Sequence, residues 1–125
     1  MNTDGDRDPL TSSILKGCFA VANELGHGLA EPIYQRALAV ELAEMGLAVG
    51  REVRFPVIYK GNDVGLYVAD FIVENEVIVE LKAIDGPLQL AHWGQCLNYM
   101  RLAKIPTGLV VNFGRPRVEW KRLKL

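Results

Sequence analysis

Apolar side chains recur at helical spacing in the first fifth of the chain. The repeating apolar positions are Ile14, Leu15, Cys18, Phe19, Ala22 and Leu25. A cap-like Thr-Ser-Ser run begins at Thr11, and Gly26 stands where a helix C-cap belongs. The pattern predicts a helix from about Thr11 to Leu25.

A second apolar repeat predicts a helix from about Glu31 to Met45. Its expected apolar stripe is Ile33, Leu38, Leu42 and Met45. Pro32 is compatible with a helix only in the first turn, where its missing N–H would have no partner. Gly46 follows at the position that favours helix termination.

The period of the pattern changes from 3.6 to 2 after the second repeat. Three β-rich runs follow, at about 49–59, 64–73 and 77–82. The turn-forming residues of KGND (60–63) separate the first two runs, and ENE (74–76) separates the last two. The pattern therefore predicts three consecutive strands joined by tight turns.

The last third of the chain returns to helix and then to strand. Residues 88–103 read as a helix, 107–113 as a buried strand and 117–123 as an alternating edge strand. The resulting order, ααβββαββ, predicts an α/β domain with a central mixed sheet flanked by helices. We expect residues 1–10 to form a disordered tail and residues 11–125 to form one domain.

Composition agrees with one globular domain. The chain has 125 residues, of which 50% are hydrophobic and 23% charged. It has neither an apolar run of the ~18 residues that a membrane span needs nor the features of a signal peptide at its start. We therefore expect a cytoplasmic protein that does not bind membranes.

Cys18 and Cys96 stand singly in helical patterns, which predicts reduced core residues.

Charge is balanced overall but uneven along the chain. The net charge is −1, unlike that of a strongly basic protein that binds nucleic acid non-specifically. The C-terminal segment carries Arg115, Arg117, Lys121, Arg122 and Lys124 against a single acid, Glu119. These residues could contact phosphates, or they could guard an edge strand against aggregation. The sequence leaves both interpretations open.

Two carboxylates and an ammonium interrupt otherwise apolar strands at Asp70, Glu80 and Lys82. A three-residue loop at 74–76 would place Val73 opposite Val77 and, counting outward, Asp70 opposite Glu80. Carboxylates at the ~5 Å spacing of such pairs repel by about 3 kcal/mol, taking an effective dielectric of about 20. A divalent cation such as Mg²⁺ would remove this repulsion. The alternative is a surface ion pair of Glu80 with Lys82, with Asp70 solvated.

These three residues also carry a resemblance to a known family. Asp70, a nine-residue spacer and Glu80-Leu81-Lys82 resemble the signature of the PD-(D/E)XK nuclease superfamily, although Ala69 replaces the proline of its name. GLAEPIY, residues 28–34, resembles the G-x-x-E-x-x-Y pattern of the small bacterial GxxExxY proteins in that superfamily. The resemblance implies a restriction-endonuclease-like core.

The resemblance extends the candidate site to two helices. Glu31 matches a glutamate that contributes to the metal site in related nucleases, although the helix macrodipole also favours an acid at this position. Gln95 and Tyr99 resemble the Q-x-x-x-Y element of RecB-like and lambda-exonuclease-like nucleases. Simple packing of Tyr99 and capping by Gln95 are the alternative.

The function implied is that of a metal-dependent nuclease. Asp70, Glu80, Glu31 and the carbonyl of Leu81 would hold Mg²⁺ or Mn²⁺, and Lys82 would orient the nucleophile or stabilise charge on the phosphate. The expected partner is nucleic acid, with DNA favoured over RNA. The alternative is a non-catalytic nucleic-acid-binding or protein-interaction module that acts as a homodimer or within a larger assembly.

Overall fold

The structure is a computed structural model that describes residues 8–125. Its helices are α2 (Pro9–Leu25), α3 (Glu31–Glu44) and α4 (Leu90–Ala103). Its strands are β1 (Val49–Tyr59), β2 (Asn62–Val73), β3 (Val77–Lys82), β4 (Thr107–Asn112) and β5 (Glu119–Lys124). The predicted ααβββαββ order is confirmed for the described part of the chain.

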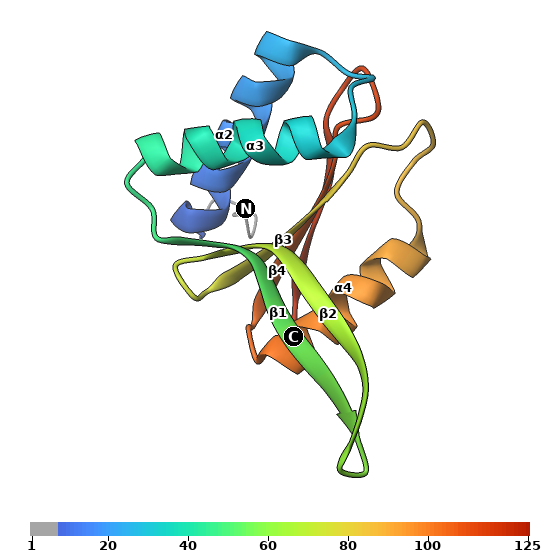
Figure 1. Ribbon diagram of the computed structural model, residues 1–125. Coiled ribbons are helices and arrows are strands. Elements are labelled where there is room, and N and C mark those ends of the chain that lie inside the picture. The colour runs from blue at the N-terminus through green and yellow to red at the C-terminus, as the bar shows by residue number, and fades with distance from the viewer. Residues whose placement is uncertain (1–7) are drawn as a thin grey trace, which may run out of the picture.

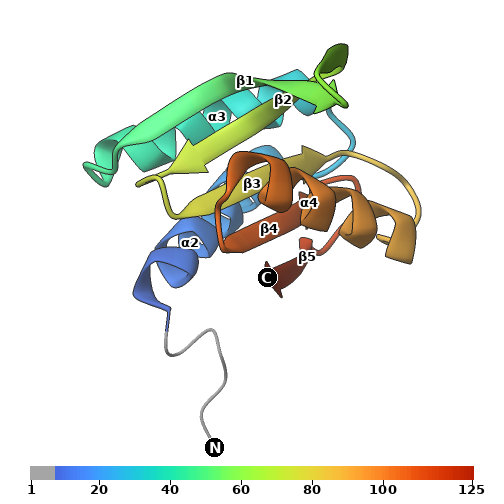
Figure 2. The ribbon, with the colours of Figure 1, turned by 90° about the horizontal axis from the view of Figure 1, so that it is seen from below.

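The five strands form one mixed sheet in the order β1-β2-β3-β4-β5. All neighbours are antiparallel except β3 and β4, which are parallel because α4 forms the crossover between them. Helices α2 and α3 cover one face and α4 covers the other (Figures 1 and 2). A separate apolar cluster lies between the sheet and the helices on each face.

Within residues 8–125, no helix is both long enough and apolar enough to span a bilayer.

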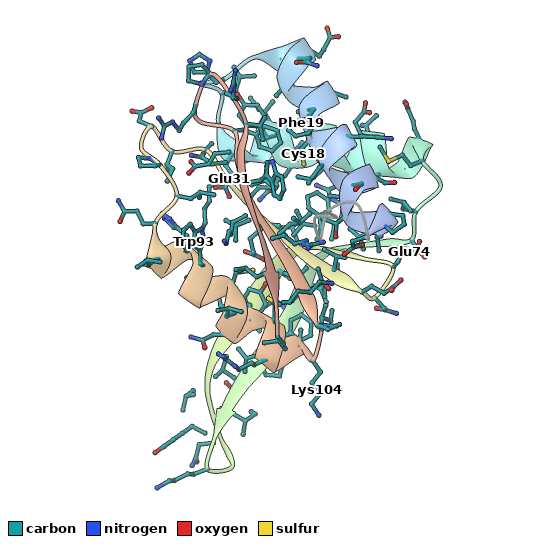
Figure 3. All side chains as sticks on the ribbon, turned by 180° about the vertical axis from the view of Figure 1, so that it is seen from behind. Cys18, Phe19, Glu31, Glu74, Trp93 and Lys104 are labelled. Carbon is teal, nitrogen blue, oxygen red and sulfur yellow. The ribbon has the colours of Figure 1, made fainter. Side chains whose placement is uncertain are left out.

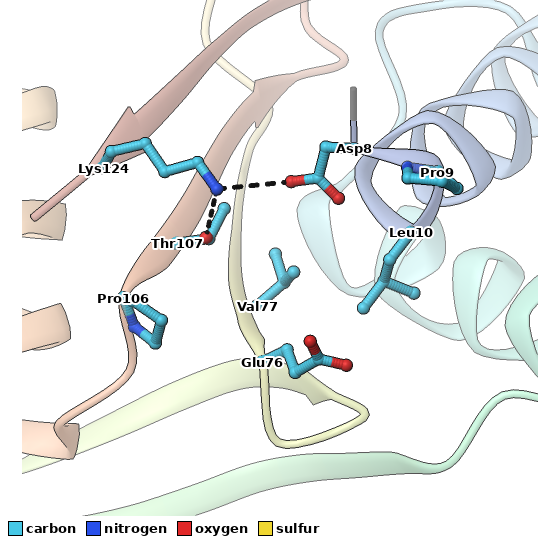
Figure 4. A pocket seen from close by; sticks show the side chains of 8 residues that line it. All are labelled: Asp8, Pro9, Leu10, Glu76, Val77, Pro106, Thr107 and Lys124. Carbon is cyan, nitrogen blue, oxygen red and sulfur yellow. Dashed lines mark hydrogen bonds and ion pairs between the residues drawn. The ribbon is translucent and has the colours of Figure 1, made fainter. Parts of the chain in front are cut away.

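Helix α2 begins earlier than predicted. Pro9 occupies its first turn, and the carboxylate of Asp8 accepts hydrogen bonds from the backbone N–H and the hydroxyl of Thr11. Lys124 lies 3.5 Å from the same carboxylate (Figure 4). The expected tail, residues 1–10, is therefore too long: residues 8–10 belong to the folded part, and residues 1–7 lie outside the described residues.

The helical stripes are narrower than predicted. Cys18 is fully buried, whereas its neighbour Phe19 is 40% exposed (Figure 3). Ile33 is also 40% exposed. Leu25 and Met45 are likewise exposed, and the stripe of α3 consists of Tyr34, Leu38 and Leu42. Each helix buries only the side that meets the sheet or the other helix, so the outer edges of the predicted stripes remain in solvent.

Strand β2 changes the face that it buries at Asp70. Tyr67 and Ala69 pack in the cluster beside α4, whereas Phe71 and Val73 pack in the cluster beside α2 and α3. Residues two apart in a regular strand share a face, so the alternation must be broken between Ala69 and Phe71. The corresponding residue of β1 is Glu52, whose φ of 50° is left-handed. Strand β2 of the long β1–β2 hairpin thus contributes side chains to the apolar clusters on both faces of the sheet. Asp70 lies at the point where it changes from one cluster to the other.

Candidate active site

The β2–β3 hairpin brings Asp70 beside Glu80. The predicted pairing of Val73 with Val77 is confirmed, and the paired part of the ladder ends at Phe71 and Val79. One step beyond, Oδ2 of Asp70 accepts a hydrogen bond of 2.8 Å from the backbone N–H of Leu81. Oε2 of Glu80 accepts one of 3.4 Å from the backbone N–H of Asp70. Both carboxylates therefore lie at the opening where β2 and β3 separate.

The carbonyl of Leu81 faces the same opening. In an extended strand the N–H and C=O groups of one residue point to the same side. The N–H of Leu81 is directed at Asp70, whereas the carbonyl of the next residue, Lys82, accepts from Phe113 on the β4 side. The backbone therefore directs the oxygen of Leu81 toward the space between β2 and β3.

Helix α3 adds Glu31 and Gln35 to this group. Nε2 of Gln35 donates to Oδ1 of Asp70 at 2.9 Å and to Oε2 of Glu31 at 3.4 Å. One amide nitrogen therefore joins a carboxylate of α3 to a carboxylate of β2. Gln35 was missed from the sequence, although its position four residues after Glu31 puts the two side chains on one helix face.

A turn between α2 and α3 positions Glu31. The hydroxyl of fully buried Tyr34 donates to the carbonyl of Gly26 at 2.7 Å and accepts from the N–H of Leu29 at 3.1 Å. Gly28, within this turn, has a φ of 96°, a region that favours glycine. The glycine and tyrosine of the G-x-x-E-x-x-Y pattern thus shape the turn, and its glutamate begins α3 (Figure 3).

An aromatic stack supports Glu80 from the α4 layer. The hydroxyl of Tyr67 donates to Oε2 of Glu80 at 2.6 Å, and its ring stacks on Tyr99 with a centroid distance of 3.5 Å. Tyr99, a predicted site residue, therefore lies next to the group that holds Glu80. Gln95 is exposed on α4 one turn earlier. Tyr67 was missed because strand alternation alone marks it as an ordinary core residue.

The carboxyl groups of Glu80, Asp70 and Glu31 each have a raised pKa. Burial, and then the charge of Asp70, raise the pKa of Glu80 to about 7 against the opposing hydrogen bond from Tyr67. Burial also raises the pKa of Asp70, to which the charge of Glu52 adds. For Glu31 the causes of the raised pKa are burial and the charge of Asp70. Each carboxylate thus lacks part of the solvation or positive charge that would favour its ionised form.

Lys82 supplies positive charge to the group. Its charge opposes the pKa rise at each of Asp70, Glu80 and Glu31. Lys82 is half-buried at the end of β3, where it pairs in register with Asn112 of β4.

Asn112 and Gly114 fix the chain that follows Lys82. The amide of fully buried Asn112 accepts from the N–H groups of Ile84 and Gly114 and donates to the carbonyls of Ile84 and Gly86. A Cβ on Gly114 would lie 2.2 Å from the carbonyl oxygen of Ile84. The β3–α4 loop is thereby held against the end of β4, next to Lys82.

The donor set fits a hard divalent cation. Carboxylate and carbonyl oxygens are the ligands that Mg²⁺ and Mn²⁺ prefer. Across residues 8–125, no group of three or more His, Cys, Asp or Glu residues is arranged to hold a metal ion. The residues therefore match the cation chemically, and the carboxylates would have to move closer together to bind one.

The basic C-terminal residues are largely engaged elsewhere. The ammonium of Lys121 lies 5.1 Å from the ring centroid of Trp93, and Arg122 and Lys124 lie within 3.7 Å of Asp8. These contacts favour the structural interpretation of the basic strand. A cavity of about 550 Å³ beside Asp8 lies at the start of β3 (Figure 4). Glu80 and Lys82 lie near the other end of β3, so the cavity is separate from the candidate site.

Comparisons with known proteins identify the superfamily of the chain. The sequence model described as the PD-(D/E)XK nuclease superfamily matches residues 8–123, nearly the whole chain. The chain belongs to the PD-(D/E)XK nuclease superfamily. Members of this superfamily are usually nucleases and typically use divalent metal ions. The α/β fold with a mixed sheet flanked by helices is consistent with the restriction-endonuclease-like core of the superfamily.

One solved structure gives a fold-level likeness. The structure titled "Crystal structure of SSO0001" is 23% identical, with a TM-score of 0.56, and the match covers 75% of this chain and 50% of that chain. This likeness supports the fold. The chain spans only half the length of that relative. No curated protein shows a significant match.

Proposed function

We propose that this protein is a metal-dependent nuclease that hydrolyses phosphodiester bonds of DNA, or of RNA, and that it belongs to the GxxExxY group of its superfamily. The observation that carries the proposal is that Asp70, Glu80 and Glu31, linked by hydrogen bonds through Gln35 and the β2–β3 backbone, all lie within the influence of the charge of Lys82. Buried and partly buried acids with raised pKa values near a lysine are typical of functional sites.

The proposed roles follow from the positions of the side chains. Asp70, Glu80, Glu31 and the carbonyl of Leu81 would hold Mg²⁺ or Mn²⁺. When bound, such an ion activates water and offsets negative charge on phosphate. Lys82 would orient the attacking water or stabilise charge developing on the phosphate.

Helix α4 completes the proposed site. Gln95 would position the phosphate or Lys82 from the exposed surface of the helix. Tyr99, one helical turn after Gln95, would support the site indirectly. Its ring stacks on Tyr67, and the hydroxyl of Tyr67 donates a hydrogen bond to Glu80.

The proposal is tested by incubating the full chain with plasmid DNA, single-stranded DNA and RNA in the presence of Mg²⁺ or Mn²⁺. Asp70→Asn should abolish cleavage. The matched control is Asp63→Asn at the exposed end of the β1–β2 hairpin, where the new amide oxygen can still accept from Gly65. Cleavage that persists in Asp70→Asn would assign the activity to a contaminant.

A second function is favoured by the spacing of the acids, since within residues 8–125 no three or more His, Cys, Asp or Glu residues are arranged to hold a metal ion. The protein would then be a nucleic-acid-binding or protein-interaction module within a homodimer or a larger assembly. Fluorescence anisotropy with labelled DNA and RNA, and light scattering, separate the two functions. Nucleic-acid binding without cleavage of any substrate would support the module.

A further inference from the structure

Gln35 occupies an unusual place between two acids of the candidate site. Its amide nitrogen lies 2.9 Å from Oδ1 of Asp70 and 3.4 Å from Oε2 of Glu31. The side chain is half-buried, and the two carboxylates come from different layers of secondary structure, a helix and a strand. A neutral amide therefore provides a shared partner for two negatively charged groups.

The geometry of an amide sets how close these carboxylates can approach. The two N–H bonds of a planar amide point about 120° apart, so the oxygens that accept them lie on different sides of the nitrogen, about 5.5 Å from each other at these distances. Mg²⁺ binds oxygen at about 2.1 Å, so two oxygens on one ion lie no more than about 4.2 Å apart. Oδ1 of Asp70 and Oε2 of Glu31 can therefore share an ion only after the nitrogen of Gln35 has left the space between them.

The other contacts of Asp70 and Glu80 do not hold two carboxylates apart. Oδ2 of Asp70 is held by the backbone of Leu81, and Oε2 of Glu80 is held by Tyr67. Those donors lie in the sheet and in the α4 layer, and each contacts an oxygen of one carboxylate only. Of the side-chain contacts described for these acids, that of Gln35 alone joins two carboxylates.

We infer that Gln35 is a displaceable spacer: its amide stabilises the metal-free arrangement of Glu31 and Asp70 and is displaced when the two oxygens that it contacts bind one cation. This inference rests on the proposed metal-dependent function. Because Gln35 stabilises the metal-free form more than the metal-bound form, it lowers the affinity for the ion. A residue that merely oriented the ligands would raise the affinity instead.

A spacer lowers the metal affinity and an orienting residue raises it, so the Mn²⁺ affinity of Gln35 variants distinguishes the two roles. Gln35→Leu removes the amide at similar size, and Gln35→Met provides a second variant that keeps an unbranched side chain. Val40→Ala, on the exposed side of the same helix, is the control for general effects on α3. Isothermal calorimetry of the full chain measures the Mn²⁺ affinity, and thermal unfolding with a chelator measures the stability of the metal-free form.

Both Gln35 variants should bind Mn²⁺ about tenfold more tightly than the wild type, since one hydrogen bond to a charged group no longer has to be broken. Both should unfold at a lower temperature without metal, and Val40→Ala should leave the Mn²⁺ affinity unchanged. Equal or weaker Mn²⁺ binding by the Gln35 variants would overturn the spacer while leaving the metal site intact. Absence of Mn²⁺ binding by the wild type would instead overturn the proposed metal site, and the spacer with it.

Discussion

The hydroxyl of Tyr67 lies 2.6 Å from Oε2 of Glu80 and donates a hydrogen bond to it. The ring of Tyr67 is itself fixed between Phe55 and Tyr99, with which it stacks. A carboxylate of the candidate site is thus oriented by a side chain whose own position is set by the α4 layer.

Tyr67→Phe is expected to weaken Mn²⁺ binding about tenfold, because hydrogen-bond partners that orient metal ligands typically contribute 10- to 100-fold to affinity. The stack should be retained, so the far-ultraviolet circular dichroism spectrum should not change. Calorimetry provides the measurement, with Tyr59→Phe at the exposed hairpin end as control. An unchanged affinity would show that Tyr67 serves packing alone.

Lys82→Met should separate binding from chemistry. Removing a positive charge beside three carboxylates leaves Mn²⁺ binding unchanged or tighter, because the ammonium repels the ion. Cleavage should fall by about 100-fold or more, since in the proposed mechanism this charge stabilises the reacting phosphate or orients the attacking water. Lys16→Met, exposed on α2, is the matched control. Full activity in Lys82→Met would remove Lys82 from the proposed mechanism.

Asn112→Ala should destabilise the fold. The substitution leaves partly buried N–H and carbonyl groups of Ile84, Gly86 and Gly114 without the four hydrogen bonds to Asn112, which costs about 2 kcal/mol in total. Urea unfolding gives the free energy of unfolding. Asn98→Ala, on the exposed side of α4, should change it by no more than about 0.5 kcal/mol. Similar values for the two variants would contradict the loop-anchoring role.

Gly114→Ala should be more harmful than an ordinary substitution in a turn. The new methyl group would meet the backbone of Ile84, which cannot move aside without breaking its bonds to Asn112. Overpacking of this kind costs about 1–3 kcal/mol or more. Gly65→Ala, where no atom lies within 4 Å of the new Cβ, is the control. The two urea midpoints should differ clearly, and equal midpoints would argue against the tight approach.

The cap at Asp8 predicts a pH dependence of stability. Partial burial acts to raise the pKa of Asp8, but the hydrogen bonds from Thr11 and the charge of Lys124 outweigh it and hold the pKa below its usual range. The folded protein therefore binds this proton less tightly than the unfolded chain does, and the stabilisation is present above the unfolded pKa and lost as pH falls through the folded one.

Asp8→Ala should cost about 0.5–2 kcal/mol at pH 7, the usual contribution of a helix N-cap. The difference from the wild type should shrink by pH 3, as measured by thermal unfolding at both pH values. Asp85→Ala, in an exposed loop, is the control. A difference that stays constant with pH would show that the carboxylate charge is not involved.

The elements of this fold could be read from the sequence because their signals are local. The periods of 3.6 and 2, the glycine after each early helix and the turn at 74–76 depend on neighbouring residues alone. The same local counting paired Val73 with Val77. The counting predicts Asp70 opposite Glu80, and the paired ladder ends one residue before them, at Phe71 and Val79.

Only the tertiary structure decided which side chains complete the candidate site and which remain in solvent. Gln35 meets Asp70 across 35 residues, and Tyr67 meets Glu80 across a hairpin whose strands have begun to separate. The exposure of Phe19 and the change of buried face at Asp70 likewise depend on how the helices lie across the sheet. Contacts between distant segments leave no periodic trace in the chain, and for that reason these features emerged only from packing.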